Sequence, residues 1–201
     1  MSIEVVLATH NQHKVQEFQR ILGSAMPEIT VVAYDGPEPV EDGVTFSANA
    51  LIKARTAAAH TGRIALADDS GIAVDVLGGA PGIFSARWSG PGRGDTANVE
   101  LLLAQLSDIA PEHRGASFHC TIALVVPEGL AHAGFEHVSE GIWLGRLAMA
   151  PSGENGFGYD PIFVPDGYDV SAAELAPETK NEVSHRARAF TELIPTLRTL
   201  F

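Results

Sequence analysis

Short apolar runs that are rich in β-branched residues alternate with amphipathic helical segments along this chain. The first run, Ile3–Ala8, predicts a buried strand. Directly after it, residues 11–22 place Val15, Phe18 and Leu22 on one face of a predicted helix. Strands and helices are mixed along the sequence without a strict strand–helix–strand repeat. This pattern predicts an α/β fold with a mixed sheet.

The remaining elements are predicted from the same periodicities and from turn and capping residues. Further strands are expected over 29–33, 64–67, 72–76, 116–126 and, as a pair, within 131–147, with an acidic turn between the two pieces at 64–67 and 72–76. A helix is expected over 45–61, ended by Gly62, and another is expected to follow a cap at Asp95 or Thr96. A short helix is expected at a capping box formed by Ser171 and Glu174. The last helix is expected from Val183 to Leu200, with a bend at Pro195.

The chain of 201 residues is long enough for one domain with a sizeable core and short for two, so a single domain over residues 1–201 is expected. No apolar run approaches the roughly 20 residues that span a bilayer, so no membrane partner is expected. The N-terminal segment lacks the pattern of a signal peptide. The single cysteine, Cys120, cannot form an internal disulfide, which favours a cytoplasmic location.

The net charge of −12, from 25 acidic and 13 basic side chains, limits the possible partners. Such a surface repels a phosphate backbone, so non-specific binding to nucleic acid is not expected. An acidic protein can still bind a small polyanion if its few cations are concentrated in one place or if a metal ion assists.

The loop between the first strand and the first helix is a candidate phosphate site. Free backbone N–H groups and the positive end of a helix dipole meet there. Thr9 and Asn11 can donate hydrogen bonds, and Lys14 adds a full charge one turn into the helix. A capped helix with a solvated lysine explains the same residues equally well.

Two acidic segments are candidates for a metal site. Glu41 precedes a helix on which Thr45, Asn49 and Lys53 are spaced four apart and share a face, which suits either a ligand wall or a solvated face. The segment Asp68-Asp69-Ser70 follows an apolar run, and adjacent carboxylates repel each other unless a cation lies near them. Magnesium prefers one or two carboxylates with waters and phosphates, although an acidic turn is the alternative interpretation.

Two later segments suit recognition of a planar ring and of an anion. Glycines flank Phe157 within residues 153–161, so a ring can lie against the aromatic side chain, and Asp160 can bind its polar edges. Lys180 and Arg186 lie near the start of the last helix, where two cations attract an anion. A glycine-rich loop with core aromatics and a solvated helix start are the corresponding alternatives.

Five strings, in this order, closely resemble the inosine-triphosphate pyrophosphatase family, also called the Ham1 or non-canonical purine NTP pyrophosphatases. The match runs from Leu7 to about Ala189. Each string is weak alone, but five in register make chance agreement improbable. The matching strings are THNQHK, EDGVTFSANALIKA, ADDSGIAVDVLGGAPGIFSARWSG, NGFGYDPIF and KNEVSHRARA.

The resemblance implies a role for residues in each string. Glu41 and Asp69 would be the metal ligands, and Asp69, supported by Asp68, the proton acceptor. Phe157 would stack on the base. The residues expected to bind the substrate are Thr9, His10, Asn11, Gln12, His13, Lys14, Lys53, Ser70, Phe157, Gly158, Tyr159, Asp160, Lys180, His185 and Arg186.

The resemblance also implies a fold and an activity. The fold would be an elongated mixed β-sheet whose flanking helices form two lobes around a central cleft, and the protein would be a homodimer. The activity would be the Mg²⁺-dependent hydrolysis of ITP, dITP and XTP to the monophosphate and pyrophosphate. The departures from the family pattern are small: His10 and His13 fill variable positions, and Asn155 stands where relatives often have glycine.

Three other functions remain compatible with these residues. A Maf-like pyrophosphatase would act on other nucleotides, a non-catalytic module would bind a nucleotide without hydrolysing it, and another metal-dependent phosphatase would release orthophosphate. The sequence does not say which residue excludes adenine and guanine.

Overall fold

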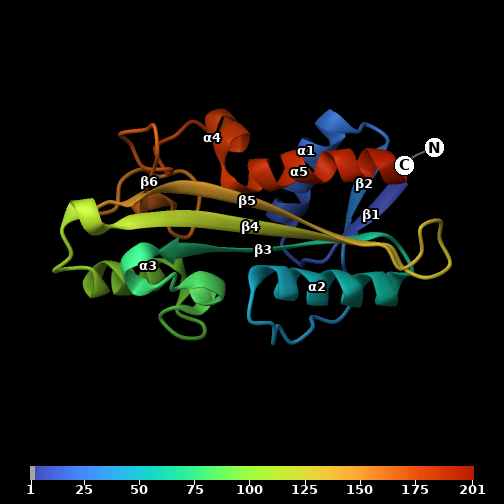
Figure 1. The fold of residues 1–201 in the computed structure, drawn as a ribbon, viewed down its shortest axis with the longest axis horizontal. Helices are drawn as coiled ribbons and strands as arrows, with labels where there is room; N and C mark the ends of the chain where they lie inside the picture. Colours follow the sequence, from blue (N-terminus) through green and yellow to red (C-terminus); the bar gives the residue numbers. More distant parts are fainter. Residues whose placement is uncertain (1–2) are drawn as a thin grey trace. The chain divides into compact units, whose positions relative to one another are not determined.

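Six strands form one sheet in the computed structural model, which describes residues 3–201 apart from the side chain of His13. The strand order is β2-β1-β3-β4-β5-β6 (Figure 1). Strand β1 is parallel to β2 and β3, whereas β5 and β6 are antiparallel, so the predicted mixed sheet is confirmed. The strands are β1 (Ile3–Leu7), β2 (Ile29–Ala33), β3 (Ala65–Val74), β4 (Gly115–Val125), β5 (Glu136–Leu147) and β6 (Phe163–Pro165).

In residues 3–201, five α-helices accompany the sheet. They are α1 (Gln12–Ala25), α2 (Phe46–Thr61), α3 (Gly94–Gln105), α4 (Pro177–Val183) and α5 (His185–Leu200). Helix α2 has the predicted ends: the Thr45 hydroxyl accepts the Ala48 N–H at 3.1 Å, and Gly62 closes the helix with a left-handed φ of 64°. None of the helices in the described chain is both long and apolar enough to cross a membrane.

The chain divides into two compact units, and the strands β3, β4 and β5 each contribute residues to both. The first unit contains the chain up to Asp69 together with 120–141 and 187–201, and the second contains 70–119 and 142–186. That the chain forms a single domain with a central cleft remains a prediction.

The first unit has a core on each face of its strands. In Figure 1, α1 and α5 lie on one face and α2 lies on the other. Because side chains alternate along a strand, Leu66 of β3 packs into the core under α1 and α5, while Ala65 and Ala67 pack under α2. Alanines also form the inner face of α2, which brings the helix backbone close to the sheet.

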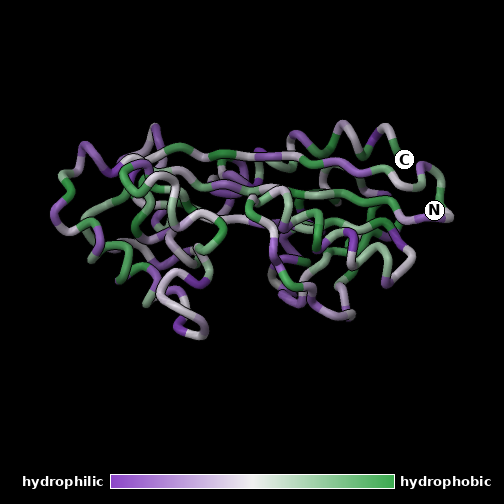
Figure 2. Tube along the Cα trace, turned by 60° about the horizontal axis from the view of Figure 1, so that its bottom comes forward, coloured by the Kyte–Doolittle hydropathy of each residue, from purple (hydrophilic) through white to green (hydrophobic). Residues whose placement is uncertain are grey.

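The second unit has a separate core that includes aromatic residues. Trp143 and Phe163 meet at 5.4 Å between ring centroids, and Phe118 contacts Phe163 edge-on at 4.7 Å. Figure 2 shows hydrophobic stretches along the strands and hydrophilic stretches at many of the loops. This core supports the loop that carries Phe157, since Tyr159 and Ile162 are part of it.

Two predictions about strands are wrong. Strand β3 runs without interruption from Ala65 to Val74, where two short strands around an acidic turn were expected, because its carboxylates are paired with lysines. Strand β5 is one strand rather than two. Its hairpin with β4 closes between Val126 and Phe135, through the Val126 N–H to Phe135 carbonyl bond at 2.9 Å, so the turn takes up the residues expected to form the extra strand.

Three details of the helices also differ from the predictions. Arg93, rather than Asp95 or Thr96, occupies the N-cap position of α3 and makes no side-chain capping bond. The last helix was expected to begin at Val183, but Val183 ends α4, which was not predicted, and α5 begins at His185 after Ser184. The Ser171 N–H does donate to the Glu174 carboxylate at 2.8 Å, but this capping-box bond closes a turn and not a helix.

Candidate functional site

The loop between β1 and α1 is shaped by its own side chains. The Thr9 hydroxyl accepts the Asn11 N–H at 3.1 Å, and the Asn11 side-chain oxygen accepts the Lys14 N–H at 3.4 Å. Asn11 therefore caps α1, as a residue just before a helix commonly does. The capping interpretation of this loop is correct, and it leaves the loop at the positive end of the helix dipole, where an anion is favoured.

Lys14 is not a solvated lysine. Its ammonium group lies 2.9 Å from both carboxylate oxygens of Asp68, whose side chain is almost fully buried in the middle of β3. Asp68 belongs to the strand face that also carries Leu66, under α1 and α5. The next residue, Asp69, belongs to the opposite face, so the two adjacent carboxylates do not converge on one point.

Lys53 of α2 links the two predicted metal ligands. Its ammonium group is 3.0 Å from Asp69 and 3.3 Å from Glu41, which reaches it from the segment between β2 and α2. Carboxylates 28 residues apart in sequence thus meet at one cation. The predicted convergence of Glu41 and Asp69 is therefore present in the geometry.

Burial and charge act in opposite directions at this lysine and its partner. Burial lowers the pKa of Lys53, but the charges of Asp69, Asp68 and Glu41 outweigh it and raise that pKa above 10.5. Burial is the largest influence on Asp69 and raises its pKa, and the negative charges of Glu41 and Asp68 raise it further. The charge of Lys53 and its hydrogen bond lower the pKa, but not by enough, so the pKa of Asp69 stays above 3.8. Asp69 is thus a stronger proton acceptor than an ordinary aspartate.

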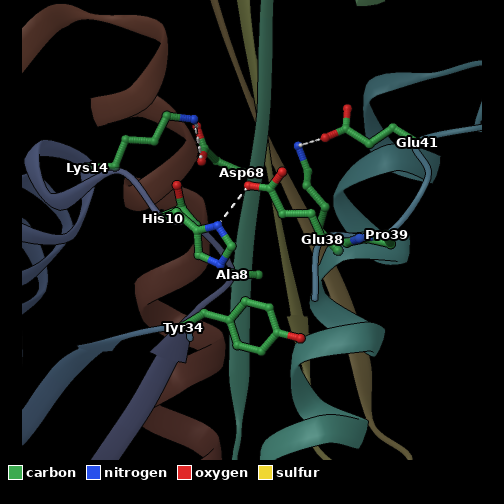
Figure 3. A pocket seen from close by; sticks show the side chains of 10 residues that line it. Ala8, His10, Lys14, Tyr34, Glu38, Pro39, Glu41 and Asp68 are labelled. Carbon is green, nitrogen blue, oxygen red and sulfur yellow. Dashed lines mark hydrogen bonds and ion pairs between the residues drawn. The ribbon is translucent and has the colours of Figure 1, made fainter. Parts of the chain in front are cut away.

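A pocket of about 190 Å³ opens at the end of β1, and its lining includes Lys14, Glu41, Lys53 and Asp68 (Figure 3). Figure 3 shows Lys14 and Asp68 on one side and Glu41 on the other. The residues that line the pocket are Ala8, Thr9, His10, Lys14, Tyr34, Glu38, Pro39, Glu41, Lys53 and Asp68.

His10 joins the first loop to the segment that carries Glu41. Its ring lies 3.0 Å from the Glu38 carboxylate and 3.1 Å from the Gly36 carbonyl, through different nitrogens. The ring also stacks on Tyr34. Sequence reasoning missed Tyr34 and Glu38, because nothing local marks a residue whose partner lies in a distant loop.

The donor set of this cluster fits a hard divalent cation. The second carboxylate oxygen of Asp69 is buried and has no hydrogen-bond partner among the described residues, and Glu41 supplies a second carboxylate beside it. Among the described residues, no group of three or more His, Cys, Asp or Glu side chains converges as a metal site. Two carboxylates leave positions for water and phosphate oxygens, as Mg²⁺ requires.

The predicted base-binding residues lie together in the second unit. The Phe157 ring is 61% exposed, with the Lys180 ammonium 5.9 Å and the Arg186 guanidinium 5.8 Å from its centroid. The Asp160 carboxylate pairs with Lys180 and accepts the Phe157 N–H at 2.8 Å. Gly156, at a φ of 78°, is required there because a side chain would collide with Asp160.

Other predicted base-binding residues contact the rest of the second unit. Tyr159 is buried and its hydroxyl donates to the Ser85 carbonyl at 2.8 Å; burial, with the charge of Asp95, raises its pKa. The Gly158 N–H donates to Asp95 at 2.9 Å, a contact that sequence reasoning missed because it treated Asp95 as a cap. His185 is buried and stacks on Phe118 at 4.8 Å.

Three further predicted substrate-binding residues lie in α1 and β3. Gln12 is exposed at the first position of α1 and does not line the pocket. Ser70 follows Asp69 in β3 as the first residue of the second unit. The side chain of His13 lies outside the described residues.

Comparison with known proteins places the chain in a family. Residues 5–196 match the Ham1 family. A protein of Leifsonia xyli named dITP/XTP pyrophosphatase is 61% identical over 198 residues, covering 98% of this chain and 97% of that protein. A Streptomyces avermitilis protein of the same name is 52% identical over 200 residues and covers 98% of both chains.

Solved structures agree with these sequence matches. A HAM1 protein from Coxiella burnetii superposes with a TM-score of 0.89 at 41% identity, covering 98% of this chain and 99% of that chain. A dITP/XTP pyrophosphatase from Mycobacterium abscessus superposes with a TM-score of 0.78 at 50% identity, covering 96% of this chain and 100% of that chain. The chain belongs to the Ham1 family.

Proposed function

We propose that this chain hydrolyses dITP, ITP and XTP to the monophosphate and pyrophosphate with Mg²⁺, and so removes non-standard purines from the nucleotide pool. The observation that carries the proposal is the meeting of Glu41 and Asp69 at Lys53, beside a pocket at the start of α1. Relatives named dITP/XTP pyrophosphatase, up to 61% identical over nearly the whole chain, support the choice of substrate.

The charges around the pocket explain why a metal would be needed. Three carboxylates, of Glu41, Asp68 and Asp69, face the two ammonium groups of Lys14 and Lys53. The cluster therefore carries excess negative charge and repels a triphosphate unless further positive charge arrives. Mg²⁺ held by Glu41 and Asp69 would supply that charge and neutralise the phosphate oxygens. Both lysines would then be available to the phosphates.

Asp69 is the proposed proton acceptor. A water oxygen attacks the α-phosphorus, and the bond from that phosphorus to the oxygen bridging to the β-phosphorus breaks. Pyrophosphate leaves with the electron pair of that bond, and the proton of the water passes to the Asp69 oxygen that Lys53 contacts in the described conformation, which leaves the other oxygen of Asp69 for the ion. Lys14 and Lys53 stabilise the charge that develops on the departing phosphates.

The base would lie against the exposed ring of Phe157, with the cations of Lys180 and Arg186 at its side. Inosine and xanthine present an oxygen acceptor at position 6, where adenine presents an amino donor. A cation directed at that position binds the first two and leaves adenine with an unsatisfied donor, which discriminates strongly. Guanine has the same 6-oxo group, so its rejection must depend on its 2-amino group.

Identifying the released anion tests the proposal. The chain is incubated with Mg²⁺ and dITP, ITP, XTP, ATP or GTP, with chelated metal as the control. Pyrophosphate from the first three, lost on chelation, is expected. Orthophosphate would indicate another phosphatase, a preference for other nucleotides would indicate a Maf-like enzyme, and bound but unhydrolysed dITP would indicate a binding module.

We also propose a cytoplasmic homodimer. The outward side chains of β5 include the exposed residues Ile142 and Leu144, an apolar pair that a second copy would cover. The buried position of the single cysteine, Cys120, fits a reducing compartment. Sedimentation equilibrium of the purified chain gives the oligomeric state; a monomer at micromolar concentration would contradict the homodimer.

A further inference from the structure

Asn49 of α2 has a side chain whose polar atoms are unusually placed. The residue is 0% exposed, and within the part of the chain that the structure describes neither its amide nitrogen nor its amide oxygen has a hydrogen-bond partner. Buried polar groups are normally paired, since an unpaired one loses its bonds to water without replacement. An unsatisfied amide in this position therefore needs an explanation.

A second buried asparagine shows the ordinary arrangement. Asn98 of α3 is equally buried, but its oxygen accepts from the N–H and the hydroxyl of Ser89, both at 2.7 Å. Its nitrogen donates to the Ala86 carbonyl at 3.2 Å. The Asn98 side chain thus contributes hydrogen bonds to folding, and the Asn49 side chain contributes none in the described conformation.

The amide of Asn49 faces the segment that carries Glu41. A Cβ atom at Gly43 would lie 2.6 Å from the Asn49 oxygen and 3.0 Å from the Asn49 backbone nitrogen, so the main chain of Gly43 lies directly against this side chain. Two residues earlier, Glu41 contacts Lys53, which is one helical turn beyond Asn49. The segment therefore runs along α2 in the opposite direction, with Gly43 at Asn49 and Glu41 at Lys53.

The same segment has little apolar anchoring. Val40 is 81% exposed and Val44 is 85% exposed, so neither residue beside the Glu41–Gly43 stretch packs into a core. Its position depends instead on polar contacts, such as the ion pair of Glu41 with Lys53 and that of Glu38 with His10. A segment held in this way moves at low cost, because few buried contacts have to break.

We propose that Asn49 is a positioning residue for Glu41: its buried amide hydrogen-bonds the main chain of residues 41–44 when the divalent ion and the nucleotide bind. This inference rests on the proposed function. When Lys53 turns to the phosphates, Glu41 loses its ammonium partner and the segment shifts. The amide then gains the bonds that it lacks in the described conformation. Bonds formed only in the complex add to affinity for the ion without adding to folding stability.

Replacing Asn49 by leucine separates the two roles, because leucine has a similar size and no polar atoms. The melting temperature of the chelated, nucleotide-free variant should equal or exceed that of the parent. The Mg²⁺ concentration for half-maximal pyrophosphate release from dITP should rise about tenfold, as loss of one or two hydrogen bonds predicts. The matched control, Asn98→Leu, should melt well below the parent with an unchanged Mg²⁺ requirement.

Gly43→Ala provides an independent variant. Gly43 has no left-handed φ, so alanine fits its backbone, but the new methyl group would displace the segment from the Asn49 amide. Gly43→Ala should raise the Mg²⁺ requirement, and its effect should not add to that of Asn49→Leu, since both act on one contact. Additive effects would overturn the proposal.

Two outcomes distinguish this inference from the proposed function. If Asn49→Leu melts far below the parent and keeps the parent's Mg²⁺ requirement, Asn49 is a structural residue and the inference is wrong, while the hydrolysis stands. If the parent releases no pyrophosphate from dITP, the proposed function itself is wrong.

Discussion

The ammonium group of Lys14 lies 2.9 Å from both oxygens of the Asp68 carboxylate, whose side chain is only 2% exposed. A carboxylate buried to this extent is stable as an anion only when a cation and further hydrogen bonds compensate its lost hydration. Lys14 therefore has a structural role in the absence of substrate, in addition to its proposed role in binding phosphate.

Replacing Lys14 by methionine should destabilise the fold by about 2 kcal/mol, because the buried Asp68 carboxylate loses its cation. The partial exposure of Lys14 keeps this loss below that of a fully buried ion pair. Urea unfolding of the variant measures this loss. Adding Asp68→Asn should restore part of the stability, since a neutral amide needs no counter-charge. If Lys14→Met alone unfolds at the same urea midpoint as the parent, the Lys14–Asp68 ion pair does not contribute to the stability of the fold.

Replacing Asp69 by asparagine should abolish pyrophosphate release and stabilise the protein at pH 7. The pKa of Asp69 is raised in the folded state, so the folded chain binds the proton more tightly than the unfolded chain. Stability therefore falls as the pH rises from about 3.8 through the raised pKa, and the charged carboxylate opposes folding above it. Asparagine does not ionise, so it makes no such pH-dependent contribution to the stability.

The melting temperatures of Asp69→Asn and of the parent, measured between pH 3 and pH 8, test whether the charged Asp69 carboxylate opposes folding. The variant should melt above the parent at neutral pH, and the gap should close toward acid pH. A variant that melts below the parent at pH 7 would mean that the Lys53 contact outweighs burial. Near-normal turnover of dITP would remove Asp69 from the mechanism.

Replacing Phe157 by alanine should raise the KM for dITP about tenfold or more and change kcat much less, since base stacking on an aromatic ring contributes about 1–3 kcal/mol. The ring is largely exposed, so the melting temperature should stay close to that of the parent. Phe157→Tyr preserves the stacking face and should behave as the parent does. An unchanged KM in the alanine variant would contradict the stacking role.

Local signals in the sequence predicted the parts of the fold that depend on local contacts. The helix α2 has both predicted ends, because Thr45 and Gly62 act on backbone groups within their own turns. The strand β2 was predicted with its observed bounds from one apolar run. Periodicity also placed Phe18 and Leu22 on the buried face of α1.

Long-range partners explain most of what the sequence did not reveal. Asp68 and Asp69 fit an acidic turn locally, and only their lysines, 54 and 16 residues away, allow them to stand in a buried strand. Asp95 resembles a helix cap, yet it holds the Gly158 N–H from 63 residues away. The resemblance of five strings identified Glu41 and Asp69 as a pair where spacing alone could not.

Replacing Arg114 by methionine should destabilise the second unit strongly. The guanidinium is buried and donates to the carbonyls of Leu106 and Ile109, just after α3, and to that of Ala148. Removal takes this donor from the Ile109 and Ala148 carbonyls, leaves the Leu106 carbonyl with only the Ile109 N–H, and leaves the negative end of the α3 dipole uncompensated, a loss of about 3 kcal/mol. Denaturant unfolding measures it, and a loss below about 1 kcal/mol would contradict this account.

Replacing Glu136 by glutamine should lower stability at neutral pH but not at acid pH. The Arg55 guanidinium donates two hydrogen bonds to this carboxylate, at 2.7 and 2.6 Å, and they hold its pKa below 4.5. A lowered pKa gives stability that is fully present above about pH 4.5 and is lost as the pH falls through the folded-state value. Both side chains are at least a third exposed, so solvent screening limits the effect to about 0.5 kcal/mol.

The matched control for this pair is Glu4→Gln. Glu4 meets Arg63 at 3.2 Å, and both side chains are about half exposed, so the ion pair is more open to solvent than that of Arg55 with Glu136. The control should therefore lose less stability at pH 7. If both variants lose the same amount at pH 7, or if the loss at Glu136 persists at pH 3, where the protonated carboxyl has no charge to pair with the guanidinium, the two-bond geometry of Arg55 contributes nothing beyond a surface charge.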